Sequence, residues 1–170
     1  MEIHRTNTFR KGMAESFNIV LGIAKAICEF IFSHSEVVPP EITSFTFGIS
    51  SSIVSVRFKG NGIYNDGFKE DSAALYRALQ GMTAEKLTIT SFMDGLALRF
   101  EYTKKGLSEK SREDNAPEGA LFSVETTDGK NEFLNDTQLF TDALKPLFED
   151  TFPDHPDIEV FLNGNRMKLT

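Results

Sequence analysis

Apolar and polar residues follow two periods along this chain, and the longest regular pattern lies near its start. From Met13 to Ser33 the polar residues fall within an arc of about 80° if the chain advances by about 100° per residue, as an α-helix does. The rest of the circumference is apolar, the reverse of an ordinary surface helix. We therefore predict a helix over 13–33 that its own domain nearly encloses or that a partner covers. The polar positions are Glu15, Asn18, Gly22, Lys25, Glu29 and Ser33.

The flanks of this helix are the candidate self-association surface. Ile19 and Phe30 lie on them, and twofold dimers are the commonest assemblies of identical chains. We favour a homodimer that covers the helix, with burial inside a single chain as the alternative. Cys28 falls on the apolar arc, so we predict a core cysteine and not a nucleophile, which needs an exposed and electropositive setting.

Period-2 patterns farther along the chain predict strands arranged as hairpins. Residues 43–50 and 53–59 alternate and are joined by a serine turn, and residues 86–91 and 96–103 are joined by Asp94-Gly95, a pair typical of tight hairpin turns. Strands paired in this way favour an α+β fold: an antiparallel sheet built from hairpins, with the long N-terminal helix and two shorter helices packed on one face. The other predicted elements are helices at 68–79 and 136–150 and strands at 120–124, 158–162 and 167–169, the last two joined by an Asn163-Gly164 turn.

The length of 170 residues predicts a single globular domain over 1–170, because a chain of this length buries a sufficient core without disulfide bonds or bound metals. Residues 1–11 show no clear period and are interpreted as a flexible arm or an edge strand. Residues 104–119 contain almost no apolar side chains, and we interpret them as a mobile loop within the domain.

The helical pattern at 13–33 does not predict a membrane anchor. Glu15, Lys25 and Glu29 interrupt it, and each charge is costly at the centre of a bilayer. The single cysteine, Cys28, excludes an intramolecular disulfide and suits a reducing compartment. We therefore expect a cytoplasmic protein without membrane attachment.

Charge is distributed unevenly along the chain. The net charge is −7, and residues 106–170 carry 14 Asp and Glu against 6 Lys and Arg. An acidic surface disfavours direct nucleic-acid binding, which draws most of its affinity from basic side chains. The same surface suits a protein partner with a basic surface, and solubility alone is the alternative explanation. The candidate partner-binding residues of this acidic segment are Asp142, Glu149, Asp150, Asp154 and Asp157.

A second candidate surface is the outer face of the hairpins. Arg57, Lys59 and Arg99 alternate with the apolar positions of their strands, so they point away from the core. If the two hairpins adjoin, these side chains form an open, mildly basic face that suits an anionic partner. An ordinary solvated sheet face is the alternative.

Two local clusters indicate small-ligand chemistry. Glycines 60, 62 and 67 lie between a predicted strand and a predicted helix, where backbone amides bind phosphate. Their spacing matches neither the dinucleotide fingerprint nor a P-loop, and turn chemistry alone explains them. Asp154, His155 and Asp157 are potential metal ligands, although their proline-containing setting also fits a plain loop.

The sequence as a whole favours a non-enzymatic protein–protein interaction module. No nucleophile–base arrangement is recognisable, and we expect neither a cofactor nor a metal. Such a module would act as an inhibitor or assembly factor on a basic partner surface. The alternative is a small-ligand or phosphate-binding protein, or a metal-dependent enzyme, that uses the 60–67 glycine loop and Asp154, His155 and Asp157.

Overall fold

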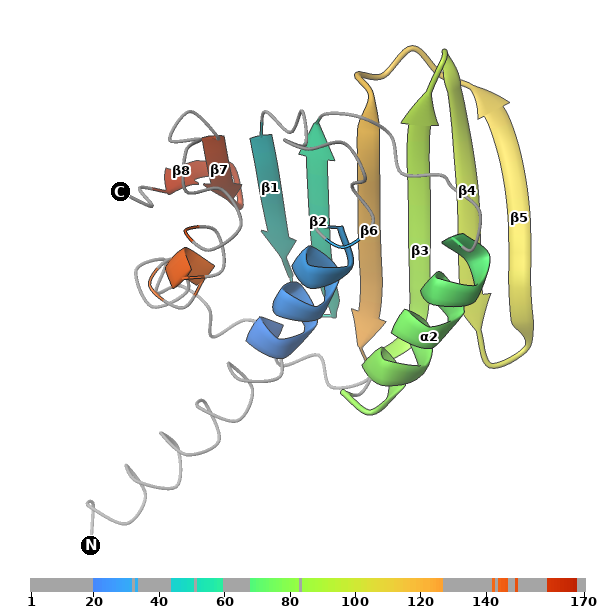
Figure 1. The fold of residues 1–170 in the computed structure, drawn as a ribbon, viewed down its shortest axis with the longest axis horizontal. Coiled ribbons are helices and arrows are strands. Elements are labelled where there is room, and N and C mark those ends of the chain that lie inside the picture. Colours follow the sequence, from blue (N-terminus) through green and yellow to red (C-terminus); the bar gives the residue numbers. More distant parts are fainter. Residues whose placement is uncertain are drawn as a thin grey trace, which may run out of the picture.

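The computed structural model of the chain shows an α+β fold built on one mixed sheet of eight strands (Figure 1). Two helices cross the same face of this sheet: the N-terminal helix, which we define by residues 20–31, and α2. The structure describes residues 20–31, 33, 44–50, 52–59, 68–82, 84–126, 142, 144–146, 149 and 159–167.

Most predicted strands and the second helix form close to the expected positions. Their bounds are β1 Ser44–Ile49, β2 Ile53–Lys59, α2 Phe68–Gln80, β3 Ala84–Met93, β4 Leu96–Thr103, β5 Gly106–Glu113, β6 Gly119–Thr126, β7 Glu159–Leu162 and β8 Asn165–Met167.

The strand order is β5-β4-β3-β6-β2-β1-β7-β8. Neighbouring strands are antiparallel except for β1 and β7, which run parallel, so the sheet is mixed and not purely antiparallel as the hairpin pattern predicted. Strand β6 pairs with both β2 and β3. The two hairpins therefore do not adjoin, because β6 separates them.

One face of the sheet carries large apolar side chains in register and packs against the helices. Phe45, Phe47 and Phe58 form an aromatic group on β1 and β2, with ring centroids 6.1 to 6.4 Å apart. Burying such residues is the main favourable term in folding, so this face holds the core. One cross-strand row of it consists of Leu162, Phe47, Val56, Phe122, Ile89 and Phe100.

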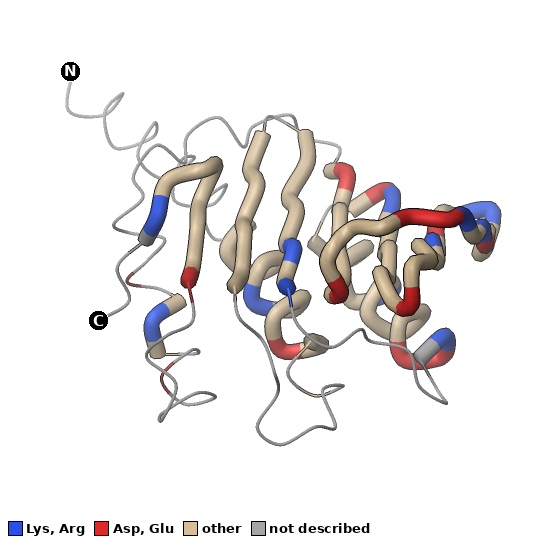
Figure 2. Tube along the Cα trace, turned by 90° about the horizontal axis from the view of Figure 1, so that it is seen from above, with Lys and Arg blue, Asp and Glu red and all other residues tan. Residues whose placement is uncertain are grey.

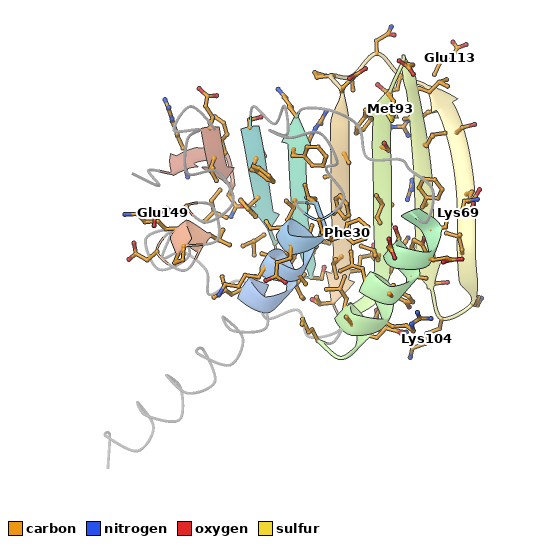
Figure 3. All side chains as sticks on the ribbon, viewed as in Figure 1. Phe30, Lys69, Met93, Lys104, Glu113 and Glu149 are labelled. Atoms are coloured by element: carbon orange, nitrogen blue, oxygen red, sulfur yellow. The ribbon has the colours of Figure 1, made fainter. Side chains whose placement is uncertain are left out.

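The N-terminal helix is buried within a single chain. Ile23 and Ile27 are fully inaccessible, and Phe30 keeps only 8% of its surface exposed. The Phe30 ring meets Phe122 of β6 edge-on, with ring centroids 5.6 Å apart; Figure 3 shows Phe30 between the helix and the central strands. Glu29 is exposed, as the polar stripe predicted. The apolar arc of residues 20–31 therefore needs no second copy to cover it.

Replacing Gly22 by alanine is expected to stabilise the fold. The added Cβ would lie 3.6 Å from the Met82 Sδ, an ordinary contact. Alanine is favoured over glycine in a helix by about 0.5–1 kcal/mol. Urea unfolding of Gly22→Ala should therefore show a higher midpoint with an unchanged slope. A lower midpoint would mean that the helix and Met82 approach each other more closely than described.

Helix α2 packs on β3 and β4 through two tyrosines. The Tyr76 and Tyr102 rings lie 6.0 Å apart, and the Tyr76 hydroxyl donates a hydrogen bond to the Glu85 carbonyl at 3.0 Å. Leu79, in the last turn, is fully buried. These contacts anchor the second half of α2 over the lower part of the sheet in Figure 1.

The structure corrects the prediction of a loop over 104–119. Residues 106–113 form β5, an edge strand paired along its whole length with β4. All eight of its residues are exposed, so they carry no apolar pattern that identifies a strand. Figure 2 shows Lys, Arg, Asp and Glu gathered toward this end of the sheet.

Both predicted tight turns are confirmed. Asp94 and Gly95 have φ values of 53° and 75°, and Asn163 and Gly164 have values of 49° and 84°, as the mirror-image hairpin turns require. Residues 142, 144–146 and 149, within the third predicted helix, are helical. Within the described ranges, none of the helices has the length and hydropathy that a membrane span requires.

Candidate functional site

Three central strands have their ends at one edge of the sheet, the upper edge in Figure 1. Strand β2 ends at Lys59, β6 begins at Gly119, and β3 ends at Met93. Residues 60–67, with their three glycines, connect Lys59 to the start of α2 at Phe68. The chain therefore leaves this edge at the end of β2 and reaches α2, whose first turn lies over β4 and β5; the connection itself lies outside the described residues.

A close backbone approach joins β6 to β2 at this edge. A Cβ on Gly119 would lie 2.0 Å from the Phe58 carbonyl oxygen, and Gly119 has a φ of +147°. Only glycine tolerates such an approach without a shift of the backbone. Gly119 therefore fixes how β6 begins beside the last residues of β2.

The cross-strand row next to this edge contains one buried polar side chain. Ala120 of β6 pairs with Phe58 of β2 and with Ser91 of β3, and Ser91 pairs with Leu98 of β4. Ser91 is fully buried, and its hydroxyl has no hydrogen-bond partner. This row lies on the helix-covered face and combines apolar walls with one unsatisfied hydroxyl.

The first turn of α2 is fixed to the sheet by polar contacts. The Lys69 ammonium lies 2.6 Å from a Glu109 carboxylate oxygen of β5, and the Tyr102 hydroxyl donates to the Lys69 carbonyl at 3.3 Å. Burial raises the pKa of the Tyr102 phenol, while a hydrogen bond with Ser72 opposes the shift. These contacts hold the end of α2 that follows the glycine-rich connection.

The three predicted basic residues lie on the face opposite the helices. Arg57 and Arg99 occupy one cross-strand row, separated by Leu121 and Thr90. The Arg57 guanidinium lies 5.1 Å from the centre of the Phe92 ring, and Arg99 lies 3.3 Å from Glu101. Lys59 is exposed at the end of β2. They lie on β2 and β4, which β6 and β3 separate, and their partner-binding role stays a prediction.

The predicted acidic segment is described only in part. Asp142 and Glu149 are exposed, and a Glu149 carboxylate oxygen lies 3.8 Å from the Lys145 ammonium, one turn earlier. Asp150, Asp154, His155 and Asp157 lie outside the described residues, as does Ile19 of the predicted self-association surface. The parts of the chain that are described hold no cluster of three potential metal ligands.

Cys28 belongs to the core, as predicted. Its side chain is fully buried. Burial, with a smaller contribution from the charge of Glu29, raises the pKa of the Cys28 thiol far above its usual value. A thiol in this setting is not a nucleophile at neutral pH.

The fold is shared with solved ATPase domains. The ATPase domain of Aquifex aeolicus MutL complexed with ADP superimposes with a TM-score of 0.53 and 16% identity over 84% of this chain. A second structure, the ATPase domain of the mismatch repair endonuclease MutL from the same organism, gives 0.54 and 14% over 88%. The chain spans 60% of the length of each. No protein-family model matches the sequence, and no curated protein is similar to it in sequence.

This similarity contradicts the predicted non-enzymatic interaction module. The fold is one that ATPase domains adopt, and nothing in the described residues supports an inhibitor or assembly factor. The sequence did not indicate a similarity to ATPase domains, because its glycine spacing matches no common phosphate-binding motif. Sequence reasoning also missed Ser91, although Leu87, Ile89 and Ser91 occupy successive inward positions of one strand. The signal in the sequence is that Ser91 is the one polar residue among these three inward positions.

Proposed function

We propose that this chain binds an adenine nucleotide. The observation that carries the proposal is the similarity of most of the chain to MutL ATPase domains, one of which is complexed with ADP. The identities are 14 and 16%, and the similarity is one of fold. We restrict the proposal to binding, since the chain spans 60% of each ATPase-domain chain.

The order of elements along the chain supports a phosphate site between β2 and α2. A strand, β2, leads through Gly60, Gly62 and Gly67 into a helix of 13 residues. Backbone amides of a glycine-rich turn and the positive end of a helix dipole both favour phosphate. In sequence, Lys59 precedes the connection and Lys69 follows it, and the Lys69 ammonium lies 2.6 Å from a Glu109 carboxylate oxygen of β5.

Thermal unfolding with and without ADP tests the proposal. A ligand that binds only the folded state, at about 100 times its dissociation constant, raises the stability by about 2.7 kcal/mol. We therefore expect millimolar ADP to raise the melting temperature by several degrees, and calorimetric titration to give a single site. The absence of both effects, with and without magnesium, would contradict nucleotide binding.

A variant of the connection locates the phosphate site. Gly62→Val introduces a branched side chain where backbone amides are proposed to approach phosphate, so ADP affinity should fall at least about 10-fold, equivalent to about 1.4 kcal/mol. The matched control is Gly22→Ala, another glycine replacement, which should leave affinity unchanged. Equal ADP affinity in Gly62→Val would place the nucleotide elsewhere on the fold.

A further inference from the structure

The face of the sheet opposite the helices carries one long cross-strand row that is rich in basic side chains. This row, which we call the basic row, crosses all eight strands from β8 at one edge to β5 at the other. Each member except Thr90 is at least partly exposed, so a ligand can reach it. In order across the sheet, the members are Arg166, Phe161, Thr46, Arg57, Leu121, Thr90, Arg99 and Lys110.

The basic row contains a repeat that only the folded sheet creates. A cation, an apolar side chain and a threonine follow one another on adjacent strands, and this order occurs twice before a third cation. Neighbouring strands lie about 4.8 Å apart, so the three arginines are spaced at about 14 Å along the row. The two repeats are Arg166-Phe161-Thr46 and Arg57-Leu121-Thr90, and Arg99 follows them.

The basic row has no acidic member, although the chain as a whole has a net charge of −7. Arg99 and Lys110 are directly opposite each other on neighbouring strands, where like charges destabilise strand pairing. Lys110 forms no ion pair with any residue that the structure describes. An anionic ligand at this end of the row would offset the repulsion between the two cations.

Two carboxylates lie beside the basic row, and both are shared with cations outside it. A Glu101 carboxylate oxygen lies 3.1 Å from the Lys86 ammonium, and the other lies 3.3 Å from the arginine of the row on the same strand. Asp114 interacts electrostatically with Arg57, and one of its carboxylate oxygens lies 3.2 Å from the Arg112 guanidinium. Cations therefore outnumber carboxylates along this part of the face, which keeps a net positive charge.

The central cation of the row is held in position by packing. The Arg57 guanidinium lies 5.1 Å from the centre of the Phe92 ring, an arrangement that favours a cation over an aromatic face. Leu121, which is half-buried, follows Arg57 in the row. An ordered guanidinium beside a partly exposed apolar side chain suits a ligand that has both carboxylates and apolar groups.

The spacing of the arginines favours a polypeptide over a nucleic acid. Phosphates follow one another about every 3.4 Å along a nucleic-acid strand, far more densely than the arginines of the row. An extended polypeptide rises about 3.4 Å per residue with alternate side chains on one face, so every fourth side chain is about 14 Å from the last. The side chain midway between two such residues falls over Leu121 or Phe161. The net charge of −7 also disfavours nucleic acid.

We propose that the basic row binds an extended, acidic protein segment that has a carboxylate at every fourth residue. The segment crosses the strands and follows the twist of the sheet, with its carboxylates on the arginines and its intervening apolar side chains on Leu121 and Phe161. This docking surface is additional to the proposed nucleotide site and does not depend on it.

Fluorescence anisotropy with a labelled peptide tests the proposal. The probe is a Glu-Ser-Val-Ser repeat of about 12 residues, which is long enough to span the row. The parent protein should bind it with an affinity that falls as salt is added. Arg99→Gln combined with Lys110→Gln should weaken binding about 3- to 10-fold. The matched control, Lys104→Gln combined with Lys105→Gln, removes the same charge from the exposed β4–β5 turn and should leave the affinity unchanged.

Several results would overturn the proposal. They are no binding by the parent protein at low salt, an equal loss of affinity in the control variant, or equal binding of a peptide with the same composition whose glutamates are adjacent. Tighter binding of a thymidine oligonucleotide that requires Arg99 and Lys110 would assign the row to nucleic acid instead. A dimer of the parent protein that the same two substitutions dissociate would assign it to a second copy of the chain. Circular dichroism should show equal melting temperatures for both variants, because their substituted side chains are exposed.

Discussion

Gly119→Ala is expected to lose most of the stability of the fold. The new Cβ would lie 2.0 Å from the Phe58 carbonyl oxygen, and the residue would have to keep a φ of +147°. Backbone strain and overpacking together should cost about 3–5 kcal/mol, a large part of the about 5–15 kcal/mol that holds a domain together. Urea unfolding monitored by circular dichroism measures the loss.

Gly106→Ala is the matched control for this change. Gly106 also has a positive φ, +118°, but nothing lies within 4 Å of an added Cβ. It should cost only the backbone strain, about 1–2 kcal/mol. Similar losses in the two variants would show that the approach of β6 to β2 is less close than described.

Phe30→Asp is expected to unfold the protein outright. Phe30 is 8% exposed and lies against Phe122 in the core. An unpaired carboxylate in this position should cost about 4 kcal/mol or more. The conservative Phe30→Leu should cost about 1 kcal/mol and stay folded. Circular dichroism and size-exclusion chromatography distinguish the variants.

The same variant decides the question of self-association. The sequence predicted Phe30 on a surface shared with a second copy, and on that interpretation Phe30→Asp yields a folded monomer. The structure buries the side chain within one chain, so the variant should have no folded form at all. A well-folded, monomeric Phe30→Asp protein would contradict burial within one chain and would place Phe30 at a subunit interface.

The sequence predicted those parts of the fold that depend on local patterns. Alternating strands such as Ile53–Lys59, the amphipathic α2 and the Asp94-Gly95 turn formed where expected. In each case the periodicity or turn chemistry lies within a few consecutive residues. The burial of Cys28 followed in the same way from its place on the apolar arc.

The parts that were not predicted depend on pairing over long distances. Residues 106–113 are exposed on every side and read as a loop, yet they form an edge strand because β4 offers a partner. The insertion of β6 between β2 and β3 brings Ala120 beside Ser91, and no local pattern specifies such a neighbour. The arrangement of the candidate site depends on this insertion. The sequence contains its residues, but it does not indicate that they lie next to one another.

The parallel pairing of β1 with β7 also determines the order in which the sheet can assemble. The hairpins β1–β2 and β3–β4–β5 join residues close in sequence and should form on the timescale of local events. Residues 44–47 of β1 pair with residues 159–162 of β7, which are far away in sequence. Contacts with such large sequence separations slow folding. A chain that has not yet been extended to Glu159 therefore leaves the outer edge of β1 unpaired, and this side of the sheet is completed only after residues 159–162 are made.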